Sequence, residues 1–141
     1  MGYRSDVRIL VSKKGFEELR KFVLKEIENY NLSEDGDYDY NLLNHATIHL
    51  NKTRTQVQLD WSWLKWYDGY KDVDAIMHGL DFLDEKGYGY RFCRIGENMD
   101  DIEEVSVDGD NDDEELDYVC VSRSFENSYE DFGFKVEYND L

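Results

Sequence analysis

The spacing of hydrophobic and polar positions changes several times along the chain, and each spacing predicts an element. Apolar residues occupy every second position from Val7 to Val11, which predicts a strand over residues 3–11. Over residues 16–30 the apolar positions recur at intervals of three and four, with charged residues between them, which predicts an amphipathic helix. Ser12 precedes this region and is a suitable N-cap. The chain therefore opens as a strand followed by a helix.

A hairpin, a second helix and another strand follow. Residues 46–50 and 57–61 both alternate between apolar and polar positions, and the short polar turn between them predicts a hairpin. Residues 72–86 return to the helical period, and Gly87 stands where a C-terminal cap is expected. Alternation resumes over residues 88–95, which predicts a strand.

The order strand, helix, strand, strand, helix, strand is that of a split βαβ unit. It predicts an α+β, ferredoxin-like sandwich in which two helices cover one face of an antiparallel sheet. Three further strands are predicted, over residues 104–107, 116–122 and 132–138. With 141 residues and no linker rich in Gly or Ser, we expect a single domain over residues 1–141, with an α+β core (1–96) and an acidic, β-rich extension (97–141).

Formal charge is concentrated in that extension. The whole chain carries a net charge of −17, but residues 97–141 hold 17 acidic residues against only Arg123 and Lys135. Charge segregated in this way creates a directed field, which predicts a surface that binds a cationic partner. The candidate contact residues are Glu97, Asp100, Asp101, Glu103, Glu104, Asp108, Asp110, Asp112, Asp113, Glu114, Glu115 and Asp117, with Glu126, Glu130 and Asp131 as additional carboxylates.

Aromatic residues cluster between the hairpin and the second predicted helix. Trp61 and Trp63 share a strand face with apolar neighbours, so we expect both rings in the core. Trp66, Tyr67 and Tyr70 follow in the predicted loop, where they either belong to the core or serve as rigid anchors of an interface. Stacking of nucleic-acid bases on aromatic rings needs basic neighbours, so the acidity of the chain argues against direct contact with nucleic acid.

The histidines and cysteines do not have the spacing of a zinc site. His45 and His49 lie four residues apart, but on a strand this separation is roughly 13 Å. His78 has no Cys or His close to it in the sequence. Cys93 and Cys120 do not have the short paired spacing of the cysteines in a structural zinc site. We therefore expect no zinc site, and we interpret both cysteines as buried, reduced thiols.

Two aspartate-rich segments match part of the ligand pattern of a calcium-binding loop. Asp108, Asp110 and Asp112 match the first three alternating ligands of an EF-hand, but Asp113 and Val119 stand where Gly and Glu are required. The segment with Asp35, Asp37 and Asp39 fails in the same way, so both are interpreted as solvated turns. Phosphate-binding glycine loops and nucleophile motifs are absent from the sequence, and we expect neither a cofactor nor an enzyme.

Three segments of the chain carry a resemblance to a group of known proteins. They are the opening Met-Gly-Tyr-Arg-Ser-Asp-Val, the segment 61–81 with Lys-Trp-Tyr-Asp and Asp-Ala-Ile-Met, and the segment 88–104 with Arg-Ile-Gly-Glu-Asn-Met-Asp-Asp-Ile-Glu-Glu. Together they cover about half of the chain, which resembles small uncharacterised proteins encoded by bacteriophages and prophages. The resemblance implies a phage origin and action on host machinery, but no activity or site residue.

Two functional hypotheses follow. The first is a phage-encoded acidic protein that inhibits or redirects a host factor by stoichiometric contact. The host factor would be, for example, a nucleic-acid-binding defence component, and the phage protein would act as a DNA mimic or an anti-CRISPR-like protein. The alternative is a small-ligand-binding protein or divalent-metal-dependent enzyme that uses the aromatic loop and the acidic residues. No apolar run approaches the ~18 residues of a membrane span, and no secretory leader is present, so we expect a cytoplasmic protein of the host bacterium. A homo-oligomer is compatible with either hypothesis.

Overall fold

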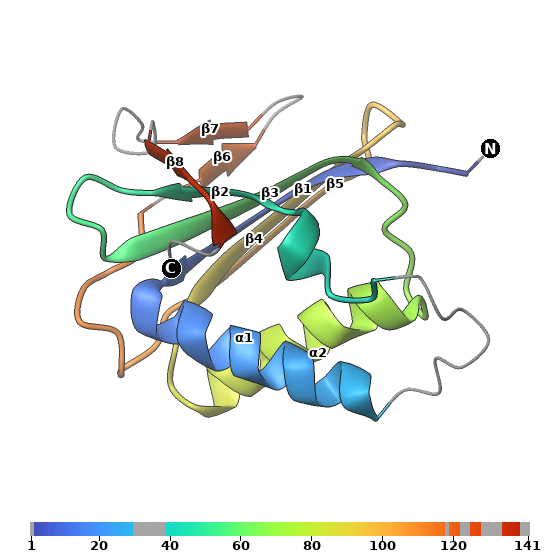
Figure 1. The fold of residues 1–141 in the computed structure, drawn as a ribbon. Coiled ribbons are helices and arrows are strands. Elements are labelled where there is room, and N and C mark those ends of the chain that lie inside the picture. Colours follow the sequence, from blue (N-terminus) through green and yellow to red (C-terminus); the bar gives the residue numbers. More distant parts are fainter. Residues whose placement is uncertain (1, 30–38, 118, 122–124, 128–133, 139–141) are drawn as a thin grey trace.

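A six-stranded antiparallel sheet with two helices on one face forms the body of the protein (Figure 1). The computed structural model describes residues 2–29, 39–117, 119–121, 125–127 and 134–138. The elements are β1 (Ser5–Ser12), α1 (Lys13–Glu28), the 3₁₀ helix η2 (Leu42–His45), β2 (Thr47–Leu50), β3 (Gln56–Leu64), α2 (Lys71–Glu85), β4 (Tyr90–Gly96), β5 (Ile102–Val107), β6 (Val119–Val121), β7 (Phe125–Asn127) and β8 (Phe134–Val136). The α+β class predicted from the periodicity is confirmed.

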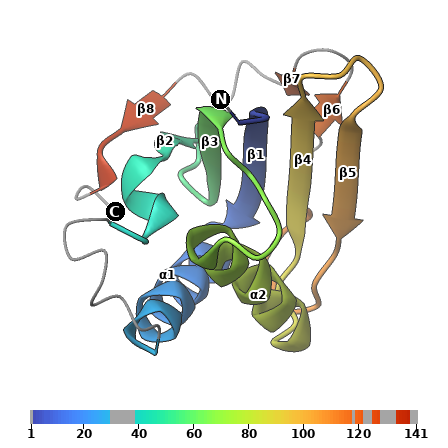
Figure 2. The ribbon, with the colours of Figure 1, turned by 90° about the vertical axis from the view of Figure 1, so that its right-hand side faces the viewer.

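The strand order of the sheet is β5-β4-β1-β3-β2-β8, and every neighbouring pair is antiparallel. The inner four strands, β4-β1-β3-β2, have the order of the split βαβ unit. The complete sheet is not strictly ferredoxin-like, because β5 extends it at one edge and β8 at the other. Figure 2 shows this arrangement end-on, with both helices packed below the sheet.

The core lies between the sheet and the helices, as the two periodicities require. Val7, Ile9 and Val11 of β1 point toward the helices and are fully buried. Ser12 caps α1, because its hydroxyl accepts a hydrogen bond from the Gly15 amide at 3.0 Å. The helices approach closely at Gly79, where an added Cβ would lie 2.5 Å from the Leu19 side chain.

The described strands of the C-terminal third lie in three places. β5 joins one edge of the sheet, β8 joins the other, and β6 and β7 form a two-stranded sheet. This small sheet lies over the face opposite the helices (Figure 1), where Val119 packs against Leu10 and Cys93. Strand β7 was not predicted. Cys93 is a buried free thiol as expected, whereas the side chain of Cys120 lies outside the described part of the structure.

Neither of the two α-helices has the length and apolar character needed to cross a membrane, a finding that concerns the described residues alone.

The placement of α2 can be tested at Leu80, whose side chain is 1% exposed within the core. Replacing Leu80 with Ala should lower the free energy of unfolding by about 2–5 kcal/mol, because the buried methyl groups are lost and a cavity remains. Chemical denaturation measures this loss. Leu24→Ala on α1 is the matched control, since Leu24 is 44% exposed and its truncation should change stability little. Equal effects of the two substitutions would contradict the core described here.

Candidate partner-binding site

The twelve carboxylates of residues 97–117 lie on β5 and on the segments before and after it. Nine of them are exposed, and Asp101, Asp112 and Asp117 are partly buried. The carboxylates from Glu97 to Glu104 lie before β5 and in its first half, and those from Asp108 to Glu115 follow its end, with Asp117 just beyond them. At the rise of a β-strand, Glu104 and Asp108 are separated by roughly 13 Å. The structure therefore divides the candidate contact residues into two clusters.

The first cluster, Glu97 to Glu104, is partly neutralised by one arginine. The Arg94 guanidinium pairs with Asp101 (Nη2–Oδ1, 2.6 Å) and with Glu103 (Nε–Oε1, 2.6 Å). The hydrogen bond to Asp101 is the largest cause of the raised pKa of Arg94. The Tyr3 hydroxyl also donates to Asp101 at 2.6 Å, and Glu97 accepts a hydrogen bond from the Arg4 amide at 2.7 Å. These carboxylates hold the N-terminal segment against the β4–β5 turn.

The second cluster lies in the loop 108–116, which is anchored by a buried arginine. The Arg91 side chain is only 7% exposed, and its guanidinium donates to the carboxylate of Asp108 at 2.7 Å. It also donates to the main-chain carbonyls of Val107 at 2.9 Å and Leu116 at 3.4 Å. Both ends of the loop are thus bound by the same cation.

Asp112 fastens the middle of this loop to two other elements. One carboxylate oxygen accepts from the Ser12 hydroxyl at 2.8 Å, and the other accepts from the buried Gly89 amide at 2.8 Å. Next to it, the Asn111 side chain donates to the Lys86 carbonyl at 2.6 Å, and the Asn111 amide donates to the Gly87 carbonyl at 2.8 Å. The loop is therefore held between the start of α1 and the end of α2.

This attachment brings a further group of carboxylates next to the loop. Asp81, Asp84 and Glu85 are exposed on the last turns of α2, where negative charge is unfavourable to the helix dipole. Burial raises the pKa of nearby Tyr90, and the charges of Asp81 and Asp84 raise it further. These three residues were not among the predicted contact residues, because only the fold places them beside the loop. A helix whose last turn carries no basic residue was the signal available in the sequence.

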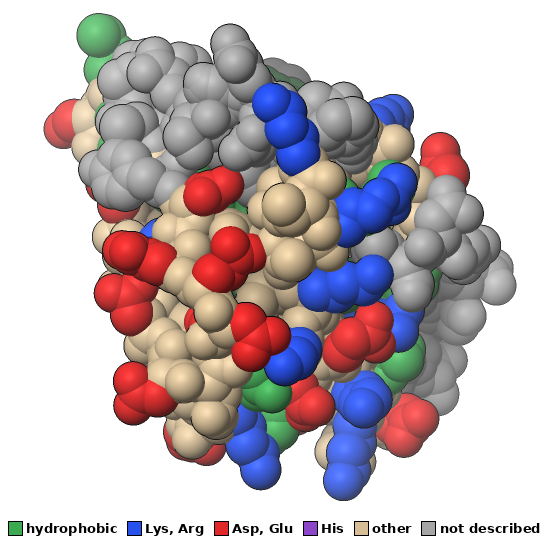
Figure 3. All heavy atoms as spheres, turned by 90° about the vertical axis from the view of Figure 1, so that its left-hand side faces the viewer, with side chains coloured by type: hydrophobic (Ala, Val, Ile, Leu, Met, Phe, Trp, Pro, Cys, Tyr) green, Lys and Arg blue, Asp and Glu red, His purple; other side chains and the backbone are tan. Residues whose placement is uncertain are grey.

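We call this combined surface the acidic end. It consists of Asp81, Asp84 and Glu85 of α2 and Asp108, Asp110, Asp112, Asp113, Glu114 and Glu115 of the loop. Figure 3 shows that Asp and Glu gather on one half of this side of the molecule, whereas Lys and Arg gather on the other half, toward α1. The charge segregation predicted from the sequence thus has a spatial counterpart.

The aromatic residues are distributed differently from the prediction. Trp61 is in the core, and its indole N–H donates to the Leu42 carbonyl at 2.8 Å. The expectation that Trp63 is buried was wrong: its ring is 60% exposed and its φ is 55°, where the β1–β3 pairing is irregular.

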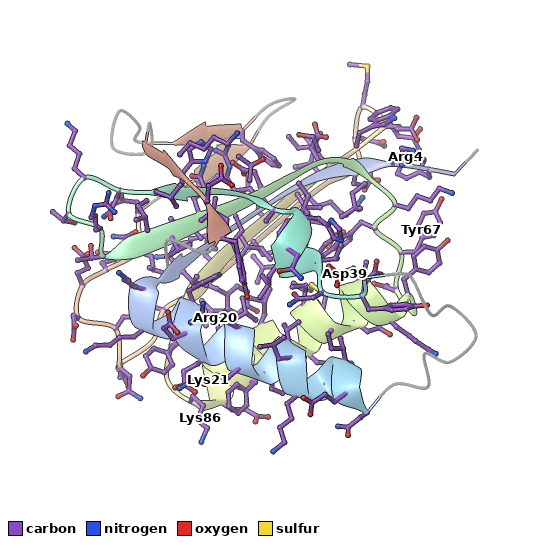
Figure 4. All side chains as sticks on the ribbon, viewed as in Figure 1. Arg4, Arg20, Lys21, Asp39, Tyr67 and Lys86 are labelled. Atoms are coloured by element: carbon purple, nitrogen blue, oxygen red, sulfur yellow. The ribbon has the colours of Figure 1, made fainter. Side chains whose placement is uncertain are left out.

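The loop after β3 holds the three proposed interface anchors. Trp66 is buried, with its ring centroid 5.9 Å from that of Trp61 and 6.1 Å from that of Phe92. Tyr67 and Tyr70 are accessible and pack edge-to-face at 4.9 Å. This loop lies at the end of the molecule opposite the acidic end (Figures 1 and 4), so the predicted contact residues do not form one surface.

The residues weighed as metal ligands are not brought together. His45 belongs to η2 and His49 to β2, while His78 lies on α2 beside Glu26. Asp108 and Asp112 bind Arg91 and Ser12, and Asp39 accepts from the Asn41 amide at 2.9 Å. Within the described ranges, no three His, Cys, Asp or Glu side chains are grouped as metal ligands would be. Asp35, Asp37, Glu130 and Asp131 lie outside the described residues, as does the side chain of Glu126.

His49 occupies an unusual position on the sheet face opposite the helices. Its Nδ1 atom is buried and has no hydrogen-bond partner among the described residues, and it lies 3.7 Å from the Asp60 carboxylate. That carboxylate already accepts from Arg8 at 2.5 and 3.1 Å and from Gln58 at 3.1 Å. Burial lowers the pKa of His49 below its usual 6.5, against the opposing effect of Asp60.

Comparisons of the chain with protein-family models, curated proteins and solved structures found no match.

The fastening role of Asp112 can be measured directly. Asp112→Ala should lower the free energy of unfolding by about 1–3 kcal/mol, because the buried Gly89 amide loses its acceptor and the cap residue Ser12 loses a partner. Asp110→Ala is the matched control, because Asp110 is exposed in the same loop and its loss should be nearly neutral. Comparable destabilisation by both variants would show that Asp112 does not fasten the loop.

The lowered pKa of His49 predicts a specific pH dependence. Below pH 6.5 the unfolded chain takes up a proton at this site more readily than the folded chain, so stability should fall as the pH is lowered through that value. His49→Gln should remove this part of the dependence, measured as the melting temperature between about pH 5.5 and 7.5. His78→Gln, at an exposed position, should retain it. An unchanged pH profile in His49→Gln would contradict this prediction.

Proposed function

We propose that this protein is a phage-encoded binding protein that inhibits or redirects a host factor by stoichiometric contact through its acidic end. The partner is a host protein with a basic surface that normally holds nucleic acid. The observation that carries the proposal is that the loop bearing six of these carboxylates is held in place by the buried Arg91 and by Asp112.

A fixed array of charges is better suited to binding than a mobile acidic tail. Ordering a loop on contact costs free energy, and this cost is reduced when the loop is already fastened in the free protein. The anchoring contacts use Asp108, Asp112 and the main chain, whereas Asp110 and Glu115 remain exposed to solvent. Binding and anchoring are therefore divided between different carboxylates.

The acidic end also keeps most of its charge. Arg91 pairs with Asp108 and Lys14 pairs with Asp113. In the described part of the chain, no ion pair joins the other seven carboxylates of the acidic end to a cation. Both side chains of the Lys14–Asp113 pair are exposed, so the ion pair contributes little free energy. The field of this end is consequently available to attract a cationic partner at a distance.

A basic channel for DNA is the kind of surface that such an array fits. Duplex DNA presents one negative charge per ~1.7 Å of axis, so proteins that hold it display Lys and Arg along a groove. Several carboxylates on one loop and an adjacent helix end can engage such side chains together, and opposite charge speeds the encounter. In keeping with the phage origin expected from the sequence, we propose a host defence or transcription component as the partner, which would give the protein an anti-defence, anti-CRISPR-like character.

The test uses substitutions that leave the anchoring contacts intact. The variant Glu85→Gln/Asp110→Asn/Glu115→Gln removes three exposed charges from the acidic end, and Glu18→Gln/Glu28→Gln/Asp68→Asn removes three elsewhere. Wild type immobilised in bacterial lysate should capture a nucleic-acid-binding protein that duplex DNA displaces. The acidic-end variant should bind that protein at least about tenfold more weakly, with a shallower salt dependence, if each charge contributes ~0.5 kcal/mol.

The control variant should bind as wild type does. Two results would contradict the proposal: equal weakening in the two triple variants, or a captured partner that binds this protein and DNA simultaneously. Either would leave the acidic residues with a role in solubility alone.

A further inference from the structure

A cleft of about 650 Å³ opens at the end of the molecule opposite the acidic end. Its lining includes three cationic side chains, Arg4, Lys65 and Lys71, two tyrosines, Tyr40 and Tyr70, and one carboxylate, Asp72. Figure 4 shows Arg4 on the strand side of this region, near Tyr67 of the loop that leads into α2. A cleft with an excess of positive charge is unexpected in a chain with 33 acidic and 16 basic residues.

The fold itself brings these cations together. In the antiparallel pairing of β1 with β3, Ser5 lies opposite Leu64, and Arg4 and Lys65 are the residues just beyond this end of the pairing. Lys71, six residues after Lys65, is the first residue of α2. An anion placed among these side chains is attracted by all three positive charges.

Hydrogen bonds fix the walls of the cleft. The Tyr3 amide donates to the Tyr67 hydroxyl at 2.5 Å, which joins the N-terminal segment to the loop. The Gly69 amide donates to Asp74 at 3.0 Å, with Gly69 at a φ of +92°, and the Tyr70 amide donates to the Tyr67 carbonyl at 3.2 Å. The cleft is therefore shaped before a ligand arrives, which lowers the cost of binding.

The lining indicates the chemical class of the ligand. Three cations in the lining suit a phosphate group. The Arg4 guanidinium uses one of its N–H groups on the Trp63 carbonyl at 3.1 Å, which orients the rest. Tyr70 is 43% exposed and, with Tyr40, offers an aromatic surface to a flat ring. The volume is in the range of small-molecule sites.

We propose that this cleft binds a nucleoside monophosphate, with the phosphate held by Arg4, Lys65 and Lys71 and the base against the tyrosine rings. Asp72 is buried, and its carboxylate accepts from the Val73 amide at 2.8 Å. It adds negative charge near the start of α2, which favours a ligand with one phosphate over ligands with longer, more negative chains. This site is separate from the acidic end, and its occupancy does not depend on the function proposed above.

Isothermal titration calorimetry with AMP, GMP, CMP and UMP tests this site. At least one of the four should bind saturably with one site per chain, and the matching nucleoside and inorganic phosphate should each bind at least about tenfold more weakly. Lys65→Gln/Lys71→Gln should weaken binding of that nucleotide by at least about tenfold. Lys21→Gln/Lys25→Gln, two exposed lysines of α1, is the matched control and should bind as wild type.

Circular dichroism and melting temperature establish that both double variants are folded, as expected for side chains at the surface. The proposal is overturned if none of the four nucleotides binds saturably, if inorganic phosphate binds as tightly as the nucleotide, or if the two double variants lose affinity equally. The Glu85→Gln/Asp110→Asn/Glu115→Gln variant should keep nucleotide binding, which separates this site from the acidic end.

Discussion

The buried guanidinium of Arg91 is the group on which the acidic surface depends. It leaves β4 on the face opposite the helices and reaches the main chain at both ends of the loop 108–116, through the carbonyls of Val107 and Leu116. Its charge also pairs with Asp108, which is exposed. Without this cation, the carbonyls of Val107 and Leu116 would lose a donor, and among the described residues only the exposed Lys14–Asp113 pair would oppose the repulsion among the loop carboxylates. One positive charge thus allows many negative charges to be held close together.

The protein places charges of opposite sign at opposite ends of one small domain. The acidic end combines the loop 108–115 with the last turns of α2, and the cationic cleft lies where β1, β3 and the start of α2 meet. At the acidic end, like charges are brought together at the C-terminal end of a helix, which is unfavourable to the folded state. We propose the two ends as separate surfaces for charged ligands of opposite sign.

The sequence predicted the central fold because local periodicity determines it. The alternation around Val7 to Val11, the helical spacing after Ser12 and the Gly87 cap each identify an element without knowledge of its neighbours. The site was only partly predictable, because it depends on contacts between distant residues. Asp112 accepts hydrogen bonds from Ser12 and Gly89, and the carboxylates of α2 lie next to the loop. Neither contact can be predicted from a local sequence pattern. Trp63 was misplaced because an irregularity in the β1–β3 pairing interrupts the alternation that predicted a buried ring.

The central claim is that the acidic loop is a fixed surface in the free protein, and amide hydrogen exchange measured by NMR tests it most directly. The Gly89 amide is bound by Asp112, the Asn111 amide by the Gly87 carbonyl, and the Asp117 amide by the Gln56 side chain. These three amides should exchange at least about a hundredfold more slowly than in an unstructured peptide. Exchange at the rate of an unstructured peptide would contradict the account, because the loop would then be a mobile acidic segment.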